Sequence, residues 1–231
     1  MKKFIVILFI LLARQSPASV IVLDYSDITP SEVIDFSGTV ISSGGYFTFG
    51  SVEFSERFVG QTVTHGGTHG FHEILSGTAT PALELTYDST LDSLFRWSAS
   101  DGDYLLGRVT TPSDPTNSVG EGSIAALFNS AVYEFGFDFI GVNGGGATVQ
   151  LFDNLGVLLL SHSITGLRDG DSIAFRGDVG IAGFSLHNTD LAGIGIDNLA
   201  LNINPVPLPG TFWLFGIGIG FVRLIASRIK S

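Results

Sequence analysis

The chain lacks cysteine and nearly lacks lysine, and each absence excludes something. With no cysteine among 231 residues there are no disulfides, and a domain of this size does not need them. Between the basic ends there is no lysine. This region contains five arginines and 22 carboxylates, so its formal charge is −17. Such a surface repels phosphate, which supplies most of the affinity of nucleic-acid binding proteins. We therefore exclude nucleic-acid binding and expect an acidic, soluble extracellular domain that attracts divalent cations.

Catalytic signatures are also missing. The sequence contains no G-x-S-x-G, no H-E-x-x-H and no phosphate-binding loop. Two of the many carboxylates could serve a carbohydrate-active hydrolase, but no pattern selects a pair. We therefore predict a protein that is not an enzyme, with the hydrolase kept as an alternative.

What is present begins with an N-terminal export signal. Lys2 and Lys3 precede an apolar stretch, residues 4–13, and Ser16-Pro17-Ala18 offers small residues for a cut after Ala18. The apolar stretch is about half of a ~20-residue membrane span. We predict a cleaved signal peptide, a helix within residues 1–18, with an uncleaved anchor as the alternative.

The C-terminus has three parts in a fixed order. Residues 204–210 are a Pro-rich linker, residues 211–226 are predicted to form a short transmembrane helix, and residues 227–231 a basic cytoplasmic tail. The helix is marginal, because a span needs about 17–25 residues. Its basic end should stay on the cytoplasmic side, and the membrane stop consists of Arg223, Arg228 and Lys230. A marginal span after a proline motif favours a temporary anchor over an ordinary tail anchor.

This tail resembles the PEP-CTERM sorting signals of Gram-negative bacteria, in the VPLPA-type variant. The motif residues are Val206, Pro207, Leu208, Pro209 and Gly210. Leu208 stands where the name-giving motif has Glu, and Gly210 where the variant has Ala. The resemblance covers about the last 27 residues. It implies an exosortase as partner, a transient anchor in the inner membrane, and delivery to the cell surface or extracellular matrix.

The central region, residues 19–203, is predicted to be one all-β domain, an antiparallel β-sandwich or jelly roll. Gly, Ser, Thr and Phe are frequent, and strand-like runs recur at short spacing between turn signals. Phe135, Phe137 and Phe139 alternate with smaller or polar residues, which places them on one face of a strand. Residues 123–129 are a candidate for two helical turns. The predicted strands are Val20–Leu23, Tyr46–Phe49, Arg57–Thr64, Ala82–Tyr87, Tyr104–Thr110, Val132–Ile140, Ala147–Phe152, Val157–Ser163, Asp171–Arg176, Ile181–Leu186 and Gly195–Ile203.

Two local patterns suggest metal binding but favour a structural interpretation. His65, His69 and His72 have the spacing of a zinc site on a helix, yet the glycines among them disfavour a helix, so we predict a polar loop between strands. The sequences 101–103 and 169–171 read Asp-Gly-Asp, as in calcium loops. Neither continues into an EF-hand, and Asp-Gly is a common hairpin turn, so turns are predicted at both.

Three residues are candidates for ligand binding. The segment from Gly195 to Leu201 resembles the last strand of extracellular jelly-roll domains, in which the Asp helps to hold a structural calcium. The resemblance implies Asp197 as a calcium ligand; an Asp at a sheet edge is the alternative. Trp97 and Tyr104, each beside charged residues, are the candidates for a glycan platform, although aromatic strand residues more often belong to a core.

The sequence thus favours a non-catalytic, exported surface or matrix protein associated with exopolysaccharide and biofilm. A calcium-stabilised, lectin-like module is the first alternative, and the hydrolase is the second.

Overall fold

The computed structural model describes residues 19–37, 43–66, 72–88, 94–99, 102–107, 121–190 and 192–204. Within these ranges the chain forms strands and one short 3-10 turn, Tyr25–Asp27, so the predicted all-β class is confirmed. No helix of the described residues is long and apolar enough to cross a membrane. The predicted signal peptide, the sorting motif, the transmembrane segment and the basic tail lie outside the described residues.

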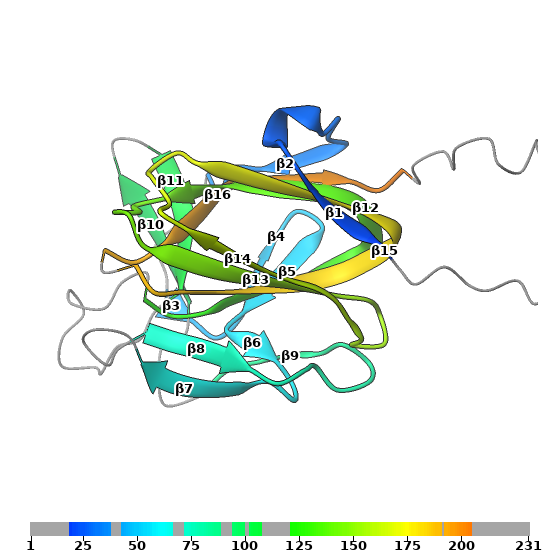
Figure 1. Ribbon diagram of the computed structural model, residues 1–231, viewed down its shortest axis with the longest axis horizontal. Coiled ribbons are helices and arrows are strands. Elements are labelled where there is room, and N and C mark those ends of the chain that lie inside the picture. Colours follow the sequence, from blue (N-terminus) through cyan, green and yellow to red (C-terminus); the bar gives the residue numbers. More distant parts are fainter. Residues whose placement is uncertain are drawn as a thin grey trace, which may run out of the picture.

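Twelve strands form one antiparallel sheet that folds over on itself (Figure 1). Two 17-residue strands, β12 (Ile124–Ile140) and β15 (Ser172–Asn188), pair with each other over both of their halves. The first half of β12 and the second half of β15 lie in one layer, and the remaining halves lie in the other. The sandwich is therefore built around two bent strands that belong to both layers.

The shorter strands extend these two layers. The first layer adds β13 (Gly146–Phe152), β14 (Leu158–Thr165), β5 (Val52–Ser55) and β4 (Phe47–Phe49). The second adds β1 (Val20–Leu23), β16 (Gly195–Asn202), β2 (Glu32–Ile34), β11 (Gly102–Gly107), β10 (Leu94–Ala99) and β3 (Ser43–Gly44). Two small sheets pair β6 (Arg57–Phe58) with β9 (Leu85–Thr86), and β7 (Thr62–Gly66) with β8 (His72–Ser76).

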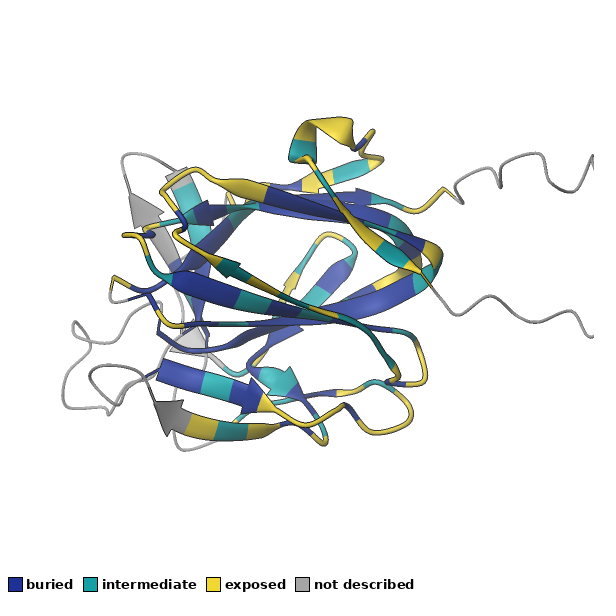
Figure 2. Ribbon diagram, in the orientation of Figure 1, coloured by how far each residue is buried: buried dark blue, intermediate teal, exposed yellow. Residues whose placement is uncertain are grey.

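The core between the layers is rich in phenylalanine. Phe135, Phe137 and Phe139 are fully buried on one face of β12, as their alternation predicts. The ring of Phe135 stacks on Phe175 and Phe184 of β15, with ring centroids 5.2 Å and 5.1 Å apart. Burying each such side chain contributes roughly 1.5–3 kcal/mol. Figure 2 shows the buried residues as dark blue stretches of the strands that enclose this core.

The predicted helix at residues 123–129 is wrong, because residues 124–129 belong to β12. Ala125 and Ala126 pair with β5 on one side and with β15 on the other. Both faces of this stretch are covered, since Ala126 belongs to the main core and Ala125 to a second cluster with Phe58 and Phe152. A strand that is buried on both faces has a continuous apolar run, which periodicity alone does not distinguish from a buried helix.

The small sheets cover the outer side of the first layer. Phe58 of β6 meets Phe152 of β13 edge to face, with centroids 5.3 Å apart. The buried amide of Gln61 donates to Gln150 Oε1 at 2.8 Å and to Ser185 Oγ at 2.9 Å. These contacts hold the small sheets against β13 and β15.

Both ends of the described domain lie at the same end of the second layer. Ile21, Arg176, Glu134 and Asn202 form one row across β1, β15, β12 and β16. Glu134 accepts from Arg176 Nε at 2.5 Å and from Asn202 Nδ2 at 2.9 Å. Three strand spacings, about 15 Å, separate the outer strands of this row.

The first described residue is held at that end. The backbone nitrogen of Ser19 donates to Asp178 Oδ1 at 2.7 Å, and the Asp178 nitrogen donates to Ser19 O at 3.1 Å.

Candidate functional site

A β-bulge in the last strand carries the predicted calcium ligand. Asp138 pairs with Asp197 and Gly136 with Ala200, so two residues of β16 oppose one residue of β12. The extra residue, Asn198, has a φ of 49°, a left-handed conformation that Asn tolerates better than most residues. We call Asp138, Asp197 and Asn198 the Asp197 bulge.

The residues of the Asp197 bulge are hydrogen-bonded to one another and to Tyr25. The Asn198 side-chain amide donates to Asp138 Oδ2 at 2.8 Å, and its backbone nitrogen donates to Asp197 Oδ1 at 2.7 Å. The Tyr25 hydroxyl donates to the Asn198 carbonyl at 2.6 Å. These bonds fix the left-handed turn of the chain and tie the 3-10 turn of Tyr25–Asp27 to β16.

Other carboxylates surround Asp197. Burial, followed by the charges of Asp138, Asp35 and Asp103, raises the pKa of Asp197, although the Asn198 amide opposes this. Asp103 itself forms an ion pair with Arg96. The arrangement therefore concentrates negative charge around a half-buried carboxylate, which makes its own ionisation less favourable.

The Asp197 bulge has the right donor chemistry for calcium but is not a complete set of ligands. Carboxylate and carbonyl oxygens are the donors that this ion takes, usually six to eight of them. Within the described ranges no group of three or more His, Cys, Asp or Glu residues is placed to hold a metal ion. Asp197 stays a prediction as a calcium ligand, and Asp138 is the carboxylate that would join it.

The aromatic candidates lie on the two strands next to the bulge, Tyr104 one strand away from β16 and Trp97 two strands away. Tyr104 of β11 is half-buried and pairs with Trp97 of β10. A Cβ placed on Gly195 would come within 2.9 Å of the Tyr104 ring, so this ring lies close over β16. The side chain of Trp97 falls outside the described part of the chain, and the glycan platform stays a prediction.

The histidine segment is a β-hairpin rather than a loop at its described ends. His65 lies on β7, where it pairs with Glu73, and His72 lies on β8, so the prediction of a loop is wrong for these residues. His69 lies outside the described residues. His72 is fully buried, and neither ring nitrogen has a hydrogen-bond partner in the described structure.

Buried Glu73 has a structural role. It accepts from the Ser123 backbone at 2.9 Å and from the Ser123 hydroxyl at 3.0 Å, while burial raises its pKa. These bonds tie β8 to the start of β12.

The second Asp-Gly-Asp sequence forms the turn that the sequence predicts. The Asp171 nitrogen donates to Arg168 O at 2.9 Å, and Gly170 has a φ of 82°, which favours glycine. The Asp169 carboxylate accepts from Gly141 and the Asp171 carboxylate from Arg168, so both stabilise local backbone. In the first Asp-Gly-Asp sequence, Asp101 is not described.

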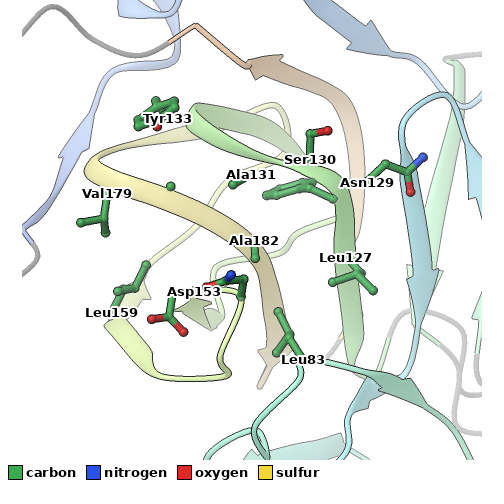
Figure 3. A pocket seen from close by; sticks show the side chains of 13 residues that line it. Leu83, Leu127, Asn129, Ser130, Ala131, Tyr133, Asp153, Leu159, Val179 and Ala182 are labelled. Carbon is green, nitrogen blue, oxygen red and sulfur yellow. The ribbon is translucent and has the colours of Figure 1, made fainter.

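A hollow opens where β12 and β15 bend. Leu127 pairs with Gly183 and the next pair is Val132 with Ile181, so residues 128–131 of β12 lie opposite Ala182 of β15 alone. Glu134 then pairs with Arg176, so residues 177–180 of β15 lie opposite Tyr133 of β12 alone. Both segments leave the ladder between β12 and β15 but stay in contact at Gly180 and Ala131, and the turn between β13 and β14 lies beside them (Figure 3).

We call this hollow the bend pocket. Its volume is about 560 Å³, within the range of about 300–1,000 Å³ that is usual for small-molecule sites. The described lining residues are Leu83, Leu127, Phe128, Asn129, Ser130, Ala131, Tyr133, Asp153, Asn154, Leu159, Val179, Gly180 and Ala182.

Sequence reasoning missed every residue of the bend pocket. Asn129-Ser130, two turn-forming residues within a strand-like run, and Asp153-Asn154, before Gly156, are the local signals of irregular backbone there. Neither signal shows that the two places meet, because more than 20 residues separate them.

Comparison with known proteins adds no family: no family model matches this chain, and no curated protein matches it.

Proposed function

We propose that the chain is an exported, non-catalytic protein of the cell surface or extracellular matrix, associated with exopolysaccharide and biofilm. It crosses the inner membrane under its signal peptide and is held there briefly by residues 211–226. An exosortase recognises the segment from Val206 to Gly210 and releases the domain to the surface or matrix.

The observation that carries this proposal is the order of motif, short apolar run and basic residues at the C-terminus. The fold is compatible with it. The last strand ends at Asn202, directly before the Pro-rich segment, so a cut beyond residue 204 removes no described strand. The acidic, lysine-free central region suits an exposed extracellular domain.

Replacing both prolines of the motif tests the sorting step. In a Gram-negative host with an exosortase, the wild-type chain should lose its C-terminal residues and leave the inner membrane, as mass spectrometry and fractionation would show. The Pro207→Ala/Pro209→Ala variant should keep the tail and remain in the membrane. Pro112→Ala/Pro115→Ala is the matched control and should behave as wild type. Identical processing of the two double variants would contradict the proposal.

A second candidate function is a calcium-stabilised, lectin-like module. The concentration of carboxylates around Asp197 favours it, because a bound divalent cation would relieve their mutual repulsion. Adding millimolar calcium after chelator treatment should raise the melting temperature of the wild-type protein. Asp197→Asn should abolish that rise. An unchanged melting temperature in the wild-type protein would exclude a structural calcium.

A further inference from the structure

The bend pocket combines an apolar floor with polar groups at its rim. Phe128 and Ala182 at the floor are buried, and Leu127, Leu159 and Val179 are half-buried walls. Polar side chains come from both strand bends and from the turn after β13. They belong to Asn129, Ser130, Tyr133, Asp153 and Asn154.

These polar groups are available to a ligand. Asp153 Oδ1 accepts from the backbone nitrogens of Leu155 and Val157, both at 2.9 Å, so the turn holds the carboxylate in place. Within the described residues Asp153 Oδ2 and the Tyr133 hydroxyl have no hydrogen-bond partner. The side chains of Asn129, Ser130 and Asn154 have none among the described residues either. This differs from the Asp197 bulge, where Asn198 bonds Asp138 and Asp197 directly.

The charge of the bend pocket restricts the class of ligand. Its described lining residues include one carboxylate and no Lys, Arg or His. A phosphate, sulfate or uronate would therefore meet a like charge and no cation. Neutral amides, hydroxyls and a fixed carboxylate acceptor match a ligand with many hydroxyl groups.

The apolar surface points to the same class. A pyranose ring presents carbon-bound hydrogens on its faces and hydroxyls around its edge. Tyr133 offers a half-buried aromatic ring with a polar tip, and the leucine and valine walls offer apolar contact. Figure 3 shows Tyr133 and Ser130 on one side of the hollow, with Asp153 and Leu159 on the other.

We propose that the bend pocket binds a short stretch of neutral polysaccharide, with Tyr133 as the stacking platform and Asp153 Oδ2 as the acceptor for ring hydroxyls. The choice of a polysaccharide rests on the proposed matrix function. The site itself is defined by the bends of β12 and β15 and differs from the predicted platform at Trp97 and Tyr104.

Calorimetric titration of the full-length chain in detergent tests the assignment. The probes are neutral glucose, mannose and galactose oligosaccharides of six units, with oligogalacturonate as the charged comparison. We expect saturable binding of at least one neutral probe and none of oligogalacturonate. Tyr133→Ala should weaken binding by about threefold to tenfold, the range of an aromatic contact.

Three further variants locate the site. Asp153→Asn retains the Oδ1 acceptor for the turn and should weaken binding by about tenfold. Tyr46→Ala removes an exposed aromatic side chain outside both candidate sites, and as the matched control it should bind as wild type. Tyr104→Ala tests the predicted platform instead. Binding that is lost in Tyr104→Ala but kept in Tyr133→Ala would overturn the assignment, as would preference for oligogalacturonate or no binding of any neutral probe. Thermal melts of each variant separate loss of binding from loss of folding.

The sorting experiment is independent of this one. Correct processing and export without glycan binding would overturn the bend-pocket assignment alone. Glycan binding by a chain whose tail is never processed would overturn the sorting proposal alone.

Discussion

At the Asp197 bulge a single extra residue interrupts β16, whereas at the bend pocket whole segments of β12 and β15 fall out of register. The small interruption leaves its polar groups close enough to bond one another, through Asn198, Asp138 and Tyr25. The large one takes whole segments out of the ladder, and the polar side chains beside it line a hollow. At the Asp197 bulge the polar groups of the protein therefore bond one another, whereas at the bend pocket polar side chains remain available to a ligand.

The comparison is most strongly tested at Asn198. Asn198→Val should lower the free energy of unfolding by about 2–4 kcal/mol, because a β-branched residue is strained at positive φ and the bond to Asp138 is lost. Asn198→Gly keeps the conformation and loses only the bond, at a cost of about 1 kcal/mol. Urea unfolding measures both values, and equal losses would show that the left-handed conformation is unimportant.

At the bend pocket the corresponding test adds a methyl group where the bends of β12 and β15 are in close contact. A Cβ on Gly180 would lie 2.7 Å from Ala131 Cβ, so Gly180→Ala should destabilise the protein by about 1–3 kcal/mol. Ala131→Gly should recover part of this loss in the double variant, and a double-mutant cycle gives the coupling. Strict additivity of the two changes would mean that the bends do not contact each other.

The smallest expected effect is the pH dependence of the Asp197 bulge. Because the pKa of Asp197 is raised in the folded state, its contribution to stability is fully present below its ordinary pKa, near 4. That contribution is lost as the pH rises through the raised value.

In chelator, Asp197→Asn should therefore lose slightly less melting temperature than wild type between pH 4 and pH 7. Calcium should reduce the difference if the ion binds at the bulge. Parallel melting curves for the two proteins would contradict the pKa assignment.

How much of this molecule the sequence predicts depends on the range of the interaction. The alternation of Phe135, Phe137 and Phe139 predicts their burial, because neighbouring residues on a strand face opposite sides. Residues 123–129 are wrongly predicted as helical, because a strand that is covered on both faces has no alternation of apolar and polar residues. The sequence predicts β15 as two strands, Asp171–Arg176 and Ile181–Leu186, and β12 as two helical turns followed by the strand Val132–Ile140, because the residues of each bend interrupt the pattern.

The candidate sites follow the same rule. Asp197 stands out in a local motif. The structure adds the carboxylates around it, which are far from Asp197 in the sequence. The bend pocket combines Leu83, Asp153 and Val179 with the β12 bend, and no local pattern links them. Only the register shifts between β12 and β15 bring these residues to one place.

The hydrogen bond between Ser19 and Asp178 implies that the predicted signal cleavage would strengthen one edge of the sandwich. In the precursor the Ser19 nitrogen is a neutral amide. A cut after Ala18 would turn it into an ammonium group 2.7 Å from a carboxylate, at the point where edge strand β1 meets β15. Such a cut would then add an ion pair where β1 joins β15, so that the cleaved chain would be held more firmly at that edge than the uncleaved one.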